Sequence, residues 1–159
     1  MNDKLFVKMA LDTWSERMKA TGDLVAKLTD DQLMSEVAPG RNRGIYLVGH
    51  LACVHDQMLP LLRFQEMLHP EGKAPFIDAA DKTVELPPVQ QVREYWKTVH
   101  DTLMGRMTAL PAEEWFTRHA SISGEDFAKE PNRNRLNLLM NRTNHLSYHR
   151  GQIALLASK

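Results

Sequence analysis

The chain has 159 residues, enough for one domain that buries roughly two-thirds of the surface of its unfolded form. Its 20 basic and 20 acidic side chains give a net charge of zero, so nothing in the composition favours binding to nucleic acid or acidic membranes. The N-terminal segment is charged throughout, no run of about 18 apolar residues occurs, and a single cysteine excludes an internal disulfide. We therefore expect one soluble, cytoplasmic domain over residues 1–159 with a small-molecule partner.

Apolar side chains at alternating steps of three and four residues predict a first helix over residues 4–28. The segment that follows reads as a connecting loop, in which Thr29 can cap a short helical turn before a Pro-Gly break. The same apolar spacing returns over residues 43–68 and predicts a second helix. Pro60 should kink this helix, because its ring clashes with the carbonyl group of Asp56.

Residues 69–88 are rich in turn formers and show no periodicity, which predicts a long crossover. A third helix should begin near Pro88 and end near Leu110, since proline suits the first turn of a helix. An irregular stretch with one helical turn near Glu113 then leads to a last helix over residues 133–157. Four long helices without a convincing strand or repeat indicate an all-α four-helix bundle.

The crossover length indicates the order of the helices. A loop of about 18 residues can span the roughly 36 Å of a 24-residue helix, so the second and third helices can run parallel. The resulting up-down-down-up bundle makes the second and last helices antiparallel. His50 then lies about 10 Å from the start of the second helix, and His149 lies about 12 Å from the end of the last. The two histidines are therefore expected at the same level of the bundle.

His145 and His149 lie four residues apart, so a helix places their side chains on one face, about 5–6 Å from each other. Together with His50, they could bind one metal ion through one ring nitrogen each. Three neutral imidazoles would leave a fourth position for water or substrate, which is typical of catalytic sites. A chain with seven histidines also forms such a pair by chance, so ordinary core histidines remain the alternative.

Three residues of the last helix could support this cluster. Asn141 and Gln152 lie one turn from the histidine pair, so either amide could orient an imidazole or bind a water molecule. Tyr148 could handle protons. As alternatives, the two amides only face solvent on the helix surface, and the tyrosine packs at a helix interface.

Other candidates have weaker spacing. Cys53 lies one turn from His50, and His100 lies beside an apolar stripe, so both are candidate extra ligands, with core packing as the alternative. His55 is about 140° around the helix from His50 and should face solvent or a partner. Asp56 and Glu94 are within conceivable reach as acids or bases, but solvated helix charges are the better interpretation.

The basic run Arg41 to Arg43 precedes the second helix. Such a run could bind an anionic group of a thiol cofactor near the helix N-terminus. A solvated loop is the favoured alternative.

GHLACVHDQMLPLL at residues 49–62 and NHLSYHRGQIALL at residues 144–156 resemble the two signature segments of the DinB-like superfamily of damage-inducible and metal-dependent proteins. The resemblance covers the whole chain, and the HRGQ run is its most specific part. It implies an up-down-down-up bundle that holds a divalent metal with His50, His145 and His149. Relatives include bacterial thiol S-transferases and mycothiol-dependent maleylpyruvate isomerases, whereas many members have no assigned reaction.

An open metal site could serve either of two chemistries. Metal-dependent hydrolysis is the first hypothesis, and S-transfer with a low-molecular-weight thiol as cosubstrate is the alternative. Zinc or nickel is the expected metal, with iron or copper as alternatives, because imidazole suits all four. A non-catalytic metal-binding or interaction bundle, including a homodimer formed through an exposed apolar face, is a third reading.

Overall fold

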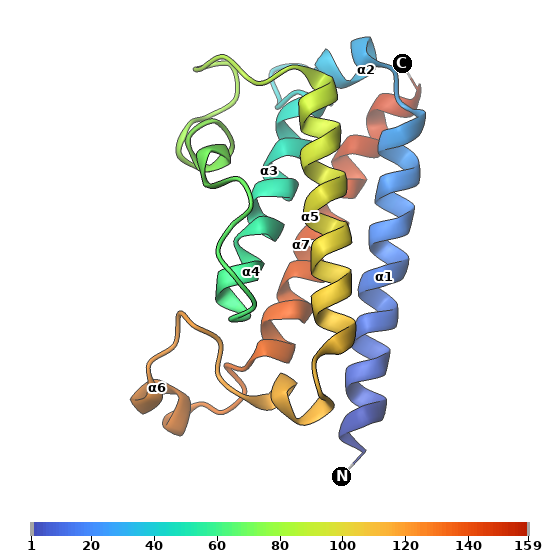
Figure 1. Ribbon diagram of the computed structural model, residues 1–159. Coiled ribbons are helices and arrows are strands. Elements are labelled where there is room, and N and C mark those ends of the chain that lie inside the picture. Colours follow the sequence, from blue (N-terminus) through green and yellow to red (C-terminus); the bar gives the residue numbers. More distant parts are fainter. Residues whose placement is uncertain (1, 159) are drawn as a thin grey trace.

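The computed structural model describes residues 2–158, and within them every regular element is helical. The predicted all-α class is confirmed. The four long helices, which lie side by side in Figure 1, are α1 (Asp3–Lys27), α3 (Gly44–Asp56), α5 (Val89–Ala109) and α7 (Arg135–Ala154). The shorter elements are α2 (Asp30–Met34), α4 (Met58–Leu61), α6 (Gly124–Lys129), η1 (Pro70–Gly72), η2 (Ala74–Asp78), η3 (Ala112–Phe116) and η4 (Leu155–Ser158).

Each long helix packs against at least two others. α3 lies against α5 and α7, while α1 lies mainly against α7 and less closely against α5. In Figure 1, α1 and α7 run toward the end of the molecule that carries α2 and the C-terminus, and α3 and α5 run away from it. Fully buried side chains from all four helices fill the space between them, including Trp14, Leu51, Leu103 and Leu146. None of the described helices has the length and apolar character needed to cross a membrane.

The link between α1 and α2 forms as predicted. Gln32 donates its backbone N–H to the Thr29 hydroxyl at 3.1 Å, and Thr29 donates its own N–H to the Gln32 side chain at 2.8 Å. This reciprocal pair of bonds is a capping box, which satisfies two N–H groups that a helix start would leave free. The expected N-cap role of Thr29 is confirmed.

The second predicted helix is shorter than expected. The prediction continued it to Leu68, but α3 ends at Asp56 and is followed only by the single turn α4. Pro60 explains the break, because its nitrogen cannot donate to the Asp56 carbonyl group and its ring crowds that carbonyl. Arg63 then adopts a φ of 60° and donates its N–H to the Pro60 carbonyl, which ends the turn. Pro60 therefore interrupts the helix instead of kinking it.

Asp56 anchors the crossover between α3 and α5. Its side chain is fully buried and accepts hydrogen bonds from the backbone N–H groups of Leu68 and His69, both at 2.8 Å, and from the Tyr95 hydroxyl at 3.1 Å. The expectation that Asp56 is a solvated charge is wrong. The crossover folds back over the end of α3 and supplies the donors that a buried carboxylate requires.

Most of the remaining elements follow the sequence, but the short helical elements η1, η2 and α6 are additions. α5 begins directly after Pro88, and η3 contains the turn expected near Glu113. The short helix α6 was not predicted. It starts at a local signal, since Ser123 accepts the N–H of Asp126 at 3.0 Å as an N-cap.

Candidate metal centre

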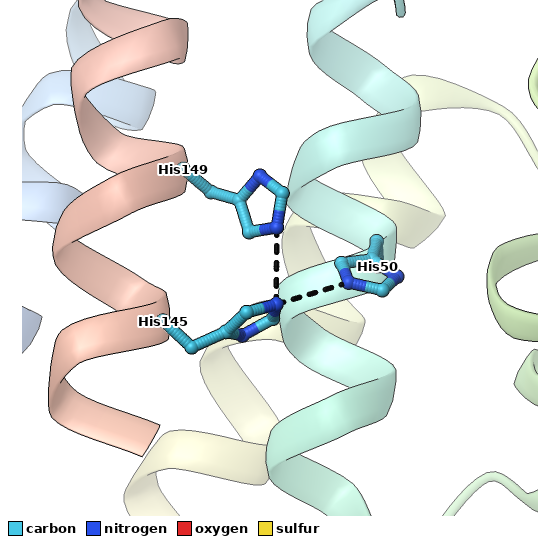
Figure 2. Close-up of side chains that lie close together, drawn as sticks. All are labelled: His50, His145 and His149. Carbon is cyan, nitrogen blue, oxygen red and sulfur yellow. Dashed lines mark hydrogen bonds between the residues drawn. The ribbon is translucent and has the colours of Figure 1, made fainter. Parts of the chain in front are cut away.

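Three imidazole rings meet in the space between α3 and α7 (Figure 2). The Nε2 atom of His145 lies 3.3 Å from Nε2 of His50 and 3.0 Å from Nε2 of His149. Each residue offers one possible ligand atom, and the three atoms lie within 4.8 Å of one another. The predicted clustering of His50 with the pair on α7 is confirmed. We call these residues the three-histidine cluster.

Two helices position the cluster. His145 and His149 are one turn apart on α7, with ring centroids 4.5 Å apart, and His50 comes from the second turn of α3. Figure 2 shows all three rings pointing from their helices toward one another. The three side chains are only partly buried.

The outer nitrogens of two rings are held by the surrounding protein. His50 donates its Nδ1–H to the carbonyl oxygen of Phe76 at 2.8 Å, and His149 donates its Nδ1–H to the side-chain oxygen of Gln152 at 2.7 Å. A neutral imidazole with its proton on Nδ1 carries a lone pair on Nε2. Both rings therefore direct a bare Nε2 toward His145, the orientation that metal-binding histidines usually take from such contacts.

The three imidazole nitrogens are arranged in a way that suits a bound cation. His145 can donate one N–H to one neighbour at most, so at least one pair of Nε2 lone pairs faces each other without a proton between them. Its Nδ1 atom is buried and has no hydrogen-bond partner among residues 2–158. In a tetrahedral zinc site with Zn–N bonds of about 2.0–2.1 Å, ligand nitrogens lie about 3.3 Å apart. Two of the three separations, 3.0 and 3.3 Å, are close to this value, and the third is within 4.8 Å.

The surroundings disfavour the charged form of the two histidines on α7. Burial, together with the neighbouring charges of His149, His50 and Arg142, lowers the pKa of His145 to about 4. Burial also lowers the pKa of His149, although its hydrogen bond with Gln152 acts in the opposite direction. Both imidazoles are therefore uncharged at pH 7, which is the form that binds a metal ion.

The supporting residues on α7 differ in their placement. Gln152 touches His149 directly, as described above. Asn141 is exposed and directs its amide to Asn137 at 3.4 Å. Tyr148 was expected to pack at a helix interface, but its side chain is 64% exposed because it projects from the outer side of α7. Its ring still contacts that of His149, with centroids 5.0 Å apart.

The contact between Phe76 and His50 was not predictable, because it uses a backbone carbonyl group in an irregular crossover. It depends on a close approach of η2 to α3 at Gly49. A Cβ atom on Gly49 would lie 2.2 Å from the buried ring of Phe76. Glycine is needed here because no side chain fits between the helix and the crossover.

Gly49→Ala is expected to lower the free energy of unfolding by about 1–3 kcal/mol, because the Phe76 ring must move to make room. Urea unfolding measures this change. Gly105→Ala is the matched control, since a Cβ there meets no atom within 4 Å, and it should raise stability by about 0.5–1 kcal/mol. Equal stability of the two variants would contradict the close approach.

His55 and His100 form a second, separate histidine pair. His55 is fully buried, and its Nδ1 lies 2.7 Å from Nε2 of His100. The rings of Trp14 and Trp96 pack around them. The expectation that His55 faces solvent or a partner is wrong, because α5, α7 and η2 cover α3 from different sides. His100, a candidate extra ligand, belongs to this pair.

The remaining candidates also lie outside the cluster. Cys53 is buried, and burial raises the pKa of its thiol, which is typical of a core cysteine. Glu94 is exposed, as expected. Arg43 makes a hydrogen-bonded ion pair with the Asp81 carboxylate, with a shortest distance of 2.7 Å. Its guanidinium therefore anchors the crossover, and Arg41 is exposed.

Comparison with known proteins agrees with this geometry. The family model of the DinB superfamily matches residues 11–153, a span that contains the whole three-histidine cluster. No curated protein matches the chain in sequence. Because the family model covers most of the chain, the protein belongs to the DinB superfamily.

Proposed function

We propose that His50, His145 and His149 bind one divalent transition metal through their Nε2 atoms and leave a coordination position open. The convergence of these three atoms, two of them with their lone pairs fixed by Phe76 and Gln152, is the observation that carries the proposal. Zinc or nickel suits a set of three imidazoles, with iron or copper as alternatives. The partial exposure of the rings supports an open position.

The reaction that we propose is metal-dependent hydrolysis of a small molecule. A divalent metal held by three imidazoles supplies a Lewis acid and lowers the pKa of water. Gln152 orients His149 and also donates a hydrogen bond to the Tyr148 hydroxyl at 3.4 Å. The Tyr148 phenol therefore stands at the exposed edge of the cluster, where it can donate a proton to a leaving group.

Tyr148→Phe is expected to lower kcat for ester or amide hydrolysis by about 100-fold, because general acid catalysis typically contributes at least that much. Metal content should not change, since the phenol is no ligand in this proposal. Hydrolysis is measured with a panel of small esters and amides. An unchanged kcat in Tyr148→Phe would remove the proton-donor role from this residue.

A parallel assay separates the alternatives. The metal-loaded protein is given an electrophile with and without a low-molecular-weight thiol. Thiol-dependent loss of the electrophile without ester or amide hydrolysis would replace the hydrolase proposal with S-transfer. Bound metal without either reaction would favour a metal-binding or interaction bundle.

The proposal includes the arrangement of the chain. We infer that α1, α3, α5 and α7 constitute one up-down-down-up four-helix bundle over residues 1–159. The pairwise packing of the helices and their directions in Figure 1 support this inference. The order matters for function, because antiparallel α3 and α7 place His50 beside the pair on α7.

A further inference from the structure

An arginine that has no counter-ion among the described residues lies beside the three-histidine cluster. Arg142 is on α7, three residues before His145, so the two side chains lie on one face, with Cβ atoms about 5–6 Å apart. It is partly buried, and its Nε atom is shielded from solvent without a hydrogen-bond partner among residues 2–158. A shielded Nε–H group that lacks a partner costs free energy, and an anion bound beside the cluster would supply that partner.

Three other shielded arginines, Arg43, Arg93 and Arg135, do have partners. Arg43 binds Asp81, Arg135 binds Glu114 at 3.2 Å, and Arg93 donates to two backbone carbonyl groups at the end of α1. Arg150 also has an Nε atom without a partner among the described residues. It follows His145 by five positions, about 140° around the helix, and so points away from the cluster. Within residues 2–158, Arg142 thus makes no ion pair and lies on the face of α7 that carries the histidines.

Further positive charge gathers next to Arg142. Burial and the charges of Arg133, Arg142 and Arg63 together lower the pKa of His119. The segment that contains His119 is held against the end of α4, where Ala120 donates its N–H to a carbonyl group at 2.9 Å. Arg63 is exposed and makes no ion pair within the described part of the chain, and Arg133 reaches only Glu130, at 3.8 Å. Arg63, Arg133 and Arg142 are thus near enough to His119 to disfavour its charged form.

We propose that the molecule taken by this centre carries a carboxylate or phosphate group, and that Arg142 binds this group while the reacting part lies at the three-histidine cluster. The inference rests on the proposed function and specifies its substrate class. A guanidinium presents parallel N–H groups that match two oxygens of such an anion. A divalent metal and Arg142 would repel each other across this short distance, and an anion between them offsets that repulsion.

The test measures the binding of simple probes to cobalt-loaded protein by calorimetry. Benzoate and phenyl phosphate represent the two anion types, and benzyl alcohol is the neutral control. Arg142→Gln and Arg142→Met remove the charge, and Arg17→Gln removes an equal charge from α1. We expect either anion to bind the Arg142 variants at least tenfold more weakly than the wild type, because a charge-assisted hydrogen bond is lost. Arg17→Gln should change the affinity by less than about twofold.

The tighter of the two anions identifies the group that Arg142 recognises. Equal affinity of the wild type and the Arg142 variants for both anions would overturn the proposal, as would benzyl alcohol binding as tightly as benzoate. Arg142→Met keeps the apolar stem and removes an unpaired charge, so it should fold even if Arg142→Gln does not.

Metal content, determined on the same samples, separates this inference from the proposed function. A wild-type protein that binds no cobalt, zinc or nickel would contradict the metal centre itself. The anion titrations would then be repeated on metal-free protein. A tenfold difference between wild type and the Arg142 variants would still support the anion site, and no difference would overturn it.

Discussion

His145→Ala is expected to weaken the binding of zinc or nickel by more than about 100-fold, beyond the 10- to 100-fold loss typical of changes to groups that only support a metal ligand. His145 lies between the other two histidines of the cluster, since its Nε2 atom is 3.3 Å from that of His50 and 3.0 Å from that of His149. Removing it leaves two nitrogens on different helices, a poor set for a metal that prefers four-fold coordination.

Competition with a chromophoric chelator measures this affinity. His69→Ala is the matched control, because it removes an imidazole that lies 3.0 Å from Glu71 on the crossover, outside the cluster. The control should bind metal as the wild type does. Equal affinities of His145→Ala and the wild type would eliminate His145 as a ligand.

Acid is expected to destabilise the metal-free protein through the buried pair His55 and His100. Burial lowers the pKa of His100 to about 3, and burial together with the charge of His100 lowers the pKa of His55 well below its usual value. In the unfolded chain, each imidazole takes up a proton near pH 6.5. In the folded chain, burial opposes this protonation. Stability is therefore complete above pH 6.5 and falls as the pH drops below it, by about 3 kcal/mol for His100 alone at pH 4.5.

Urea unfolding at pH 7 and pH 4.5 measures the effect. The double variant His55→Leu with His100→Leu should lose less stability between these two pH values, because two buried bases have been removed. Chelator-treated samples are used throughout, so the histidines of the cluster contribute equally to both proteins. The same loss in the wild type and the double variant would show that the pair does not cause the acid sensitivity.

The sequence predicted those features that depend on local spacing. The periodicity of apolar residues indicated the four long helices, and the four-residue step placed His145 and His149 on one face. The position of His50 along the bundle axis, beside His149, followed from the helix lengths and the antiparallel order, since one residue of helix adds about 1.5 Å. These predictions succeeded because each requires only the geometry of a single helix or a pair of antiparallel helices.

The errors concern the segments that cover α3. Asp56 was assigned to solvent, and His55 to solvent or a partner, because a helix pattern does not reveal what packs against each side of the helix. His55 instead contacts His100 of α5 and Trp14 of α1. In the structure, residues beyond α4 fold back and donate to Asp56, while η2 covers α3. The Phe76 carbonyl that orients His50 belongs to the same irregular segment. No side-chain pattern marks a backbone carbonyl as a partner of a histidine.

The position of Arg142 is a different case. The sequence shows that an arginine is present at this position. Whether a carboxylate pairs with it depends on which distant segments pack around α7. Arg43 shows the opposite outcome, because a basic run that could bind an anion has an internal aspartate, Asp81, as its partner. The inference of an anionic substrate group therefore required the structure.

X-ray absorption spectroscopy of the zinc-loaded protein, together with its metal content, tests the metal centre most directly. We predict one zinc ion per chain with three imidazole nitrogens at about 2.0–2.1 Å and one further light-atom ligand. The spectrum of His145→Ala should lose one imidazole. A protein that takes up no metal, or a zinc ion bound by sulfur or by fewer than three imidazoles, would contradict the assignment of His50, His145 and His149.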